Sequence, residues 1–323
     1  MSQSRLATAL NDGLLALPVG NICVMRPPIT YDVSPVPRAA VHIVHGFYPD
    51  YISWERAGYP VSTEIVRASV AIVVVPRAKA LARDMVARAC AAADLVLVDG
   101  QKTDGVDSLF KECRKVLGGL PSVTKGHGRL FWFAATDAFA DWVAGPPEKG
   151  PHGFYTNAGV FSDGAVDAGS ALLADHLPTK LPARMADLGA GWGYLAGPVL
   201  ERDSVASLDL IEAEALSVDC ARKNVQDDRV TIHWADATDF VSDSAFDGIV
   251  MNPPFHISRS ADPGIGRTFI QAAARLLTPN GKLWMVANRH LPYETTLSDT
   301  FRNVDMIAST NAFKVFHANR PKR

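Results

Sequence analysis

The sequence predicts an α/β protein of two domains, each built on a mostly parallel sheet, and three observations indicate this. The chain has 323 residues, about the length of two average domains. In both halves, short apolar runs alternate with segments of helical composition, which is typical of parallel strands joined by crossover helices. A stretch rich in Gly and Pro, Ala144 to Gly153, has no hydrophobic period and marks a linker. We therefore expect one domain over residues 1–145 and a second over residues 146–323.

Strands and helices alternate through the first half. The first 20 residues mix small apolar and polar positions and predict a helix that ends near Leu17. Farther along, Pro76 ends a strand and precedes an Ala-rich helix, and Gly118 closes another helix. The expected strands cover residues 21–25, 40–44, 70–75, 94–98, 121–124 and 129–134, and the expected helices cover residues 1–17, 60–69, 77–92 and 106–117.

The second half alternates more plainly. A glycine-rich turn follows the strand that ends at Leu188, and a tight turn at Pro279 leads into a late strand. Two final strands form a hairpin about Asn311. The expected strands cover residues 184–188, 205–211, 230–234, 246–251, 282–287, 304–310 and 313–318, and the expected helices cover residues 168–176, 194–201, 213–224 and 267–277.

The two halves repeat one pattern. Each has a strand that ends at a proline, Pro76 or Pro253, followed by a helix, a strand and a terminal hairpin. This repetition indicates an ancient duplication. Because the first half has no glycine-rich turn after a strand, we expect it not to hold a nucleotide cofactor.

Composition and charge exclude several classes of protein. The formal net charge is −2, so the chain lacks the global basic character of many nucleic-acid binders, and an RNA substrate would need local basic patches. No run reaches the ~18 apolar residues of a membrane span, and the histidines have no metal-ligand spacing. We expect a cytoplasmic monomer without a metal. Reduced, unpaired thiols are expected at all four cysteines, Cys23, Cys90, Cys113 and Cys220.

A stiff turn, Asn252-Pro253-Pro254-Phe255-His256, follows the apolar run from Phe246 to Met251 and should lie at the carboxyl end of a buried strand. Each proline fixes its own φ, lacks an N–H and pushes its predecessor toward extended geometry. The Asn252 side-chain oxygen and the Pro253 carbonyl are thereby held in place. Such a pair is suited to accept hydrogen bonds from a planar –NH2 group. A plain loop broken by two prolines is the alternative interpretation of this motif alone.

A second turn, Asp187-Leu188-Gly189-Ala190-Gly191-Trp192-Gly193, follows one strand and opens a helix. Glycines at such a bend allow tight turning and let the backbone approach a ligand closely. Tyr194 stands where a dinucleotide-binding motif favours a third glycine, which argues against a pyrophosphate site. The spacing resembles the first motif of class I S-adenosylmethionine methyltransferases. This resemblance implies that Asp187, Gly189, Gly191 and Gly193 bind S-adenosyl-L-methionine.

Two further acids are candidates for the same cofactor site. An acid that ends the next strand would take the ribose hydroxyls, and Glu212 and Asp209 compete for this role. Glu212, which lies 25 residues after Asp187, is favoured by the helical pattern that follows it. Asp209, within the strand, is the alternative. Asp236 follows the strand at residues 230–234 and is positioned to accept a hydrogen bond from the adenine amine.

The second half resembles the bacterial rRNA guanine-N2 methyltransferases of the small-subunit methyltransferase C type, and their large-subunit relatives, over about residues 157 to 318. Trp192 departs from the family, where a small residue is more usual, and its ring is expected to reshape the cofactor pocket. The segments that carry the resemblance are Gly159-Val160-Phe161-Ser162, Asp167 with Gly169-Ser170, Asn252 to His256, Val286-Ala287-Asn288, Leu291-Pro292-Tyr293 and Phe313-Lys314-Val315.

The resemblance implies two tandem Rossmann-like methyltransferase folds. The N-terminal copy would be degenerate and would bind the RNA substrate, while the C-terminal copy would be a catalytic, seven-stranded class I domain. The implied reaction moves a methyl group from S-adenosylmethionine to the N2 amine of a guanine in ribosomal RNA, most simply 16S rRNA. The catalytic turn would be Asn252, Pro253, Pro254 and Phe255. Substrate binding would involve Phe255, His256, Arg259 and Arg267.

Other functions stay open at this point. The acceptor could be a guanine of large-subunit rRNA, the N6 amine of adenine or a protein glutamine. Enzymes of the last two kinds usually carry Tyr at the position of Phe255, which favours guanine. A vestigial cofactor site would instead make the chain an RNA-binding assembly factor, whose partner would still be ribosomal RNA or a ribosomal subunit.

Overall fold

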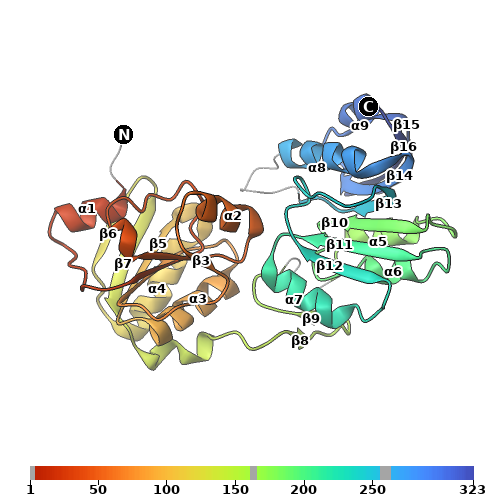
Figure 1. Cartoon of the computed structure of the whole chain (residues 1–323). Coiled ribbons are helices and arrows are strands. Elements are labelled where there is room, and N and C mark those ends of the chain that lie inside the picture. The colour runs from red at the N-terminus through yellow and green to blue at the C-terminus, as the bar shows by residue number, and fades with distance from the viewer. Residues whose placement is uncertain (1–3, 161–165, 255–262) are drawn as a thin grey trace. The chain divides into compact units, whose positions relative to one another are not determined.

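The computed structural model describes residues 4–160, 166–254 and 263–323 (Figure 1). The chain divides into two compact units, Met1–Pro146 and Pro147–Arg323, which are called unit 1 and unit 2 below. Each unit contains a seven-stranded sheet in which one strand runs antiparallel to its two neighbours and the others are parallel. The expected α/β class with a mostly parallel sheet in each half is confirmed.

Unit 1 has the strand order β3-β2-β1-β4-β5-β7-β6. One face of this sheet buries a continuous core, in which Ile43, Ile72 and Leu97 of the strands pack with Leu6 and Trp54 of two helices. The elements of unit 1 are α1 (Arg5–Asn11), β1 (Ile22–Met25), β2 (Val41–Val44), α2 (Tyr48–Arg56), β3 (Val61–Ser62), β4 (Val70–Val74), α3 (Lys79–Ala92), β5 (Leu95–Gln101), α4 (Val106–Leu117), β6 (Ser122–Lys125) and β7 (Gly128–Ala134).

In unit 1, one expected helix is wrong and another is shorter than expected. Residues 60–69 form the short strand β3 and turns, and the helix lies earlier, at α2. Pro49 in the first turn of α2 suits a helix start, and Trp54 anchors the helix by donating its indole N–H to the Pro27 carbonyl at 2.8 Å. The first helix stops at Asn11 instead of Leu17, because Gly13 takes a left-handed conformation (φ 68°) and turns the chain back.

Unit 2 has the strand order β12-β11-β10-β13-β14-β16-β15. Its expected elements are present, and one unexpected helix, α9, precedes the final hairpin. The elements are β8 (Glu148–Lys149), β9 (Tyr155–Thr156), α5 (Ala168–Asp175), β10 (Arg184–Leu188), α6 (Ala196–Leu200), β11 (Ser207–Glu212), α7 (Ala215–Asn224), β12 (Val230–Trp234), β13 (Phe246–Met251), α8 (Pro263–Leu276), β14 (Leu277–Asn288), α9 (Glu294–Thr300), β15 (Phe301–Ser309) and β16 (Phe313–Pro321).

Alternating side chains bury both faces of the unit 2 sheet. On β13, Ile249 and Met251 pack into the core with α8 and α9, whereas Val250 packs on the opposite face with α5 and α6. Met285 and Trp284 of β14 divide between the two faces in the same way. This explains why the strands are continuous apolar runs, as expected when helices cover both faces of a parallel sheet.

The two sheets have the same order once their strands are numbered from the start of each unit, since β1 corresponds to β10 and β4 to β13. This agreement is the one that a duplication predicts. The corresponding turns differ in sequence. In unit 1, Arg26-Pro27-Pro28 follows β1, where a glycine-rich turn follows β10 in unit 2. Among the described residues, no helix is both long and apolar enough to cross a lipid bilayer.

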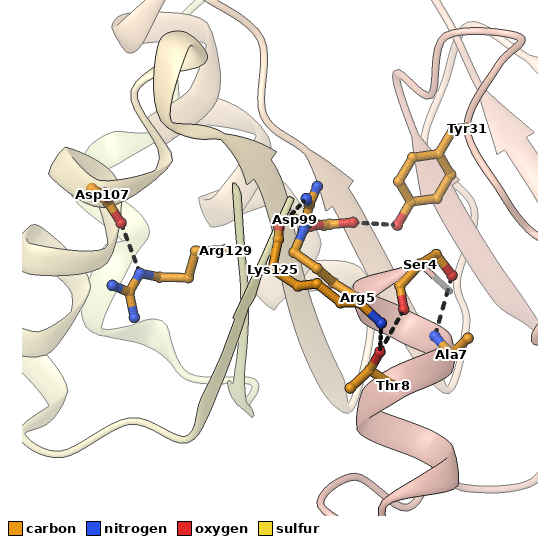
Figure 2. Close-up of polar contacts among 9 residues, drawn as sticks. All are labelled: Ser4, Arg5, Ala7, Thr8, Tyr31, Asp99, Asp107, Lys125 and Arg129. Carbon is orange, nitrogen blue, oxygen red and sulfur yellow. Dashed lines mark hydrogen bonds and ion pairs between the residues drawn. The ribbon is translucent and has the colours of Figure 1, made fainter. Parts of the chain in front are cut away.

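A buried charge pair fastens α1 to the sheet of unit 1. Asp99 of β5 is 3% exposed and accepts hydrogen bonds from Arg5 Nε at 2.5 Å and from the Tyr31 hydroxyl at 3.0 Å. Figure 2 shows this group beside a second pair, Arg129 Nε and Asp107 Oδ1 at 2.8 Å, which is far more exposed. Burial raises the pKa of Asp99, and the charge of Arg5 together with the hydrogen bonds from Arg5, Tyr31 and the Gly100 N–H opposes that rise.

Replacing Asp99 with alanine is expected to destabilise unit 1 by about 3–5 kcal/mol, because removing one partner of a buried pair leaves the Arg5 charge uncompensated. The matched control is Asp107→Ala, which breaks the exposed pair with Arg129 and should cost no more than about 1 kcal/mol. Urea unfolding of both variants gives the comparison. Equal losses for the two variants would contradict a special role for the buried pair.

Candidate active site at the carboxyl edge of the unit 2 sheet

Four polar side chains meet at one edge of the unit 2 sheet. Asp187 is the next-to-last residue of β10, Glu212 ends β11, Asp236 follows β12, and Asn252 follows β13. These four strands are parallel and adjacent. β11 lies on one side of β10 and β13 on the other, so the strand order reverses between β10 and β13. This is the switch point at which open α/β sheets bind ligands.

The glycine turn after β10 depends on left-handed backbone. Gly189, Gly191 and Gly193 have φ values of 77°, 57° and 89°. A Cβ on Gly193 would lie 2.8 Å from Val225 Cγ2, so this glycine is also required for packing against the end of α7. A Cβ on Gly191 would meet no described atom within 4 Å, which leaves that side of the turn open for a ligand.

Glu212 is locked in place by two backbone donors. The Gly191 N–H donates to its Oε2 at 2.8 Å, and the Glu214 N–H donates to its Oε1 at 2.7 Å. A carboxylate has about four acceptor positions, so acceptor capacity remains for a ligand with paired hydroxyls. Asp209, the alternative, lies mid-strand and binds His233 Nε2 at 2.7 Å. The strand-end position favours Glu212 for the ribose.

Asp187 is a buried acid for which the described part of the chain supplies no counter-group. It is 1% exposed, and neither carboxylate oxygen has a hydrogen-bond partner among the described residues. Burial, with the nearby charge of Glu212 as the second cause, raises the pKa of Asp187 to about 8. A buried carboxylate without partners is costly, and a bound cation is the simplest group that would offset this cost. The edge therefore fits a positively charged ligand.

Asp236 is half-buried just beyond β12. Its Oδ1 accepts from the Thr238 backbone N–H at 2.8 Å and from the Thr238 hydroxyl at 2.7 Å. Both donors belong to Thr238 and bind the same oxygen, Oδ1, so they fix the Asp236 carboxylate. Its other oxygen, Oδ2, takes no part in these two bonds. This oxygen is suited to accept a hydrogen bond from an amine.

The Asn252 side chain is oriented by α5. Its Nδ2 donates to Asp167 Oδ1 at 2.8 Å and to Ser170 Oγ at 2.9 Å. The β10 and β13 register pairs Leu188 with Met251, so Gly189 and Asn252 occupy the next positions on strands about 5 Å apart. The glycine turn and the Asn252 amide are therefore neighbours at the switch point.

Comparisons with known proteins identify the family. Residues 152–317 match the family model described as methyltransferase small domain. A ribosomal RNA small subunit methyltransferase C from Shewanella sp. (strain MR-4) is 31% identical over 258 residues, which cover 76% of this chain and 75% of that protein. The protein of the same name from Shewanella oneidensis is 30% identical over 259 residues, with the same coverage. The chain belongs to the ribosomal RNA small subunit methyltransferase C family. It is therefore a methyltransferase.

The fold of this methyltransferase agrees with that of a solved protein. The T. thermophilus 16S rRNA N2 methyltransferase, determined in complex with AdoMet and guanosine, superposes with a TM-score of 0.79. The likeness covers 98% of this chain and 92% of that one at 22% sequence identity, so it concerns the fold. The expectation of two tandem methyltransferase folds is thereby confirmed.

The remaining substrate-binding candidates of this methyltransferase are only partly described. Phe255, His256 and Arg259 lie outside the described residues. Arg267 lies on the exposed side of α8. In unit 1, three basic side chains have partners within the unit. Lys79 Nζ pairs with Glu112, Lys125 Nζ donates to Thr8 Oγ1, and Arg129 pairs with Asp107.

Trp192, the departure from the family pattern, is 3% exposed and buried in a cluster with Val160 and Cys220. Its ring lies 4.6 Å from that of Phe154, centroid to centroid. The Trp192 carbonyl accepts from Asn224 Nδ2 at 2.9 Å. The large ring thus fastens the segment before α5 against the glycine turn and α7.

Sequence reasoning missed Asp167 and Ser170 as site residues of this methyltransferase. An acid directly before a segment of helical composition is a recognisable N-cap, and Asp167 does accept from the Ser170 backbone N–H, three residues on, at 2.8 Å. Nothing local in the sequence indicates that the cap also contacts Asn252, 85 residues away.

Among the described residues, no group of three or more metal-ligating side chains is present.

Proposed function

We propose that this methyltransferase transfers a methyl group to the exocyclic N2 amine of a guanine in small-subunit ribosomal RNA. Its methyl donor is S-adenosylmethionine. Family membership supports the reaction class and the ribosomal RNA substrate. One observation supports an –NH2 acceptor in particular. The amide nitrogen of Asn252 is held by Asp167 and Ser170, which leaves the amide oxygen as the group able to accept an N–H.

The cofactor assignment rests on three acids at the carboxyl edge and on the glycine turn. Asp187 would face the positive charge of the cofactor, which would supply the partner that this carboxylate lacks among the described residues. Glu212, fixed by Gly191 and Glu214, would accept from the ribose hydroxyls. Asp236 would accept from the adenine amine, and the open side of Gly191 allows close approach. S-adenosylmethionine supplies an electrophilic methyl group carried on a sulfonium centre.

The catalytic turn would activate a poor nucleophile. The guanine amine is weakly nucleophilic because its lone pair is delocalised into the ring. The Asn252 side-chain oxygen and the Pro253 carbonyl would each accept one of its N–H groups, which favours a pyramidal nitrogen with its lone pair free. Acceptors fixed before reaction stabilise the positive charge that develops on nitrogen. Holding both reactants in line supplies much of the remaining acceleration.

No strong base is needed, because the amine becomes acidic once it is alkylated and releases its proton to water. Phe255 is proposed to stack on the base, a contact worth roughly 1–3 kcal/mol. His256 is proposed to line the same site. A paired guanine must first leave its helix, at a cost of a few kcal/mol. The single chain is proposed to be the working unit, since unit 2 carries both the glycine turn and Asn252.

We also propose that Arg259 and Arg267 contact RNA phosphates near the catalytic turn and that unit 1 helps to bind the RNA. Replacing Arg267 with glutamate is expected to weaken RNA binding and to lower the slope of log K against log salt by about 1. The control is Arg302→Glu, an exposed arginine at the opposite edge of the unit 2 sheet. Filter binding over a salt series gives both slopes, and identical slopes for the two variants would remove Arg267 from the interface.

The proposed function is tested with labelled S-adenosylmethionine and three substrates: naked 16S rRNA, assembled small subunits and large subunits. Digestion of the product to nucleosides and mass spectrometry should find the label in N2-methylguanosine from small-subunit rRNA. Label in N6-methyladenosine, in large-subunit RNA or in protein would overturn the proposal. Because its proposed substrate is ribosomal RNA, the enzyme is also proposed to act in the cytoplasm.

A further inference from the structure

We propose that Asp167 and Ser170 are positioning residues, which set the direction of the Asn252 amide and so determine that the catalytic turn accepts N–H groups. The proposal rests on the proposed function and adds to it two residues that orient the catalytic asparagine. Asp167 and Ser170 lie at the start of α5, whereas Asn252 follows the end of β13, far away in the sequence.

An asparagine amide can face either way, because its oxygen and its nitrogen have nearly the same shape and opposite hydrogen-bonding character. At Asn252, both N–H groups are occupied, one by Asp167 Oδ1 at 2.8 Å and one by Ser170 Oγ at 2.9 Å. An ionised carboxylate only accepts hydrogen bonds. A flipped amide would place the Asn252 oxygen against Asp167, acceptor against acceptor. The carboxylate therefore selects one orientation of the amide.

The selecting group is itself rigid. Asp167 is the N-cap of α5, and the same Oδ1 accepts from the Ser170 backbone N–H at 2.8 Å. Ser170 is 8% exposed. Gly169 directly precedes Ser170, and a Cβ on it would lie 3.0 Å from both Asp167 Oδ1 and Phe313 Cε1. The ring of Phe313 in β16 therefore packs directly on the first turn of α5, and the cap has little room to move.

The orientation matters because the substrate amine offers only N–H groups at this point. With its oxygen forward, Asn252 accepts one of them. With its nitrogen forward, it would present a donor to a donor and repel the amine. An amide that is free to turn would spend time in both states, and only one of them stabilises the charge on the reacting nitrogen. Fixing the acceptor before the substrate arrives is preorganisation of the site.

The test is Asp167→Asn, which keeps the shape of the side chain but replaces a group that can only accept with an amide that can turn either its oxygen or its nitrogen toward Asn252. We expect kcat to fall at least about tenfold, since the acceptor is no longer fixed. The Kd for S-adenosylmethionine, measured by calorimetry, should stay within about twofold, and Tm should change little. Ser170→Ala, which removes one of the two acceptors, should lower kcat by less. The matched control is Asp175→Asn, an exposed acid at the other end of the same helix, which should leave kcat unchanged.

A double-mutant cycle separates positioning from a general structural effect. In the Asn252→Ala background there is no amide to orient, so adding Asp167→Asn should change the residual rate less than about twofold. An equal loss in both backgrounds, or an unchanged kcat in Asp167→Asn alone, would overturn the proposal. If Asp167→Asn does not fold, the same double-mutant cycle is measured with Ser170→Ala in place of Asp167→Asn. If the wild type methylates a different amine, the cycle is measured on that product, so that the proposed function fails while the positioning role is still decided.

Discussion

Replacing Asn252 with alanine is expected to lower the rate of methyl transfer by roughly 10²–10³-fold or more, close to complete loss, while the affinity for S-adenosylmethionine changes little. In the proposed mechanism Asn252 is a fixed acceptor at the position where positive charge develops, and the loss of one such preorganised group typically has an effect of this size. The cofactor groups lie on other strands, at the ends of β10, β11 and β12, so they should keep their geometry.

Single-turnover rates with labelled cofactor measure the chemical step directly, and calorimetry measures cofactor affinity. The matched control is Asn303→Ala, an exposed asparagine of β15 whose amide binds Asn319. It should retain full activity. Survival of activity in Asn252→Ala would make the catalytic assignment wrong. Loss of cofactor binding together with activity would instead indicate that Asn252 supports the cofactor edge.

The strands of unit 2 were predictable because local signals and tertiary packing agree. The bounds of β10, β12 and β13 are those expected from the sequence, since each is an apolar run between polar or turn-forming residues. The short helices α2 and α9 were not expected. Helices of one or two turns are marginal by themselves and depend on contacts that the local sequence does not display.

The outline of the site was predictable for a related reason. Parallel strands present their carboxyl ends at one edge, so an acid or amide at the end of each strand can be placed there from sequence alone. The two backbone donors that fix the Glu212 carboxylate come from the folded turn, and the sequence alone does not indicate them. The contact between Asp167 and Asn252 joins residues 85 positions apart, and no periodicity or spacing encodes it. That Asp187 has no partner among the described residues is likewise visible only in the folded structure.

Replacing Asp187 with asparagine is expected to abolish cofactor binding and, unusually for a buried site, to make the free protein more stable at alkaline pH. The folded-state pKa of Asp187 is raised to about 8, far above the value of about 3.9 for an exposed Asp. A raised pKa means that the folded state binds the proton more tightly. Its contribution to stability is therefore complete below about pH 4 and is lost as pH rises through about 8.

Between pH 5 and pH 8, three pH units, this loss amounts to at most about 4 kcal/mol at 1.36 kcal/mol per unit. The wild type should therefore lose stability relative to Asp187→Asn across that range, as measured by urea unfolding without cofactor. The control is Asp305→Asn, an exposed acid of β15, which should keep the wild-type dependence on pH. Parallel curves for wild type and Asp187→Asn would show that the acid has a partner in solution.

The cofactor should reverse this cost in the wild type alone. A bound cation offsets the buried negative charge of Asp187, so S-adenosylmethionine should raise the Tm of the wild type and leave that of Asp187→Asn unchanged at the same concentration. The acid thus destabilises the free protein at pH 8 and stabilises the complex, because the same carboxylate that lacks a partner among the described residues is the one that the ligand would satisfy. A cofactor-induced shift in Tm that is equal in both proteins would contradict this role and move the cationic site elsewhere along the edge.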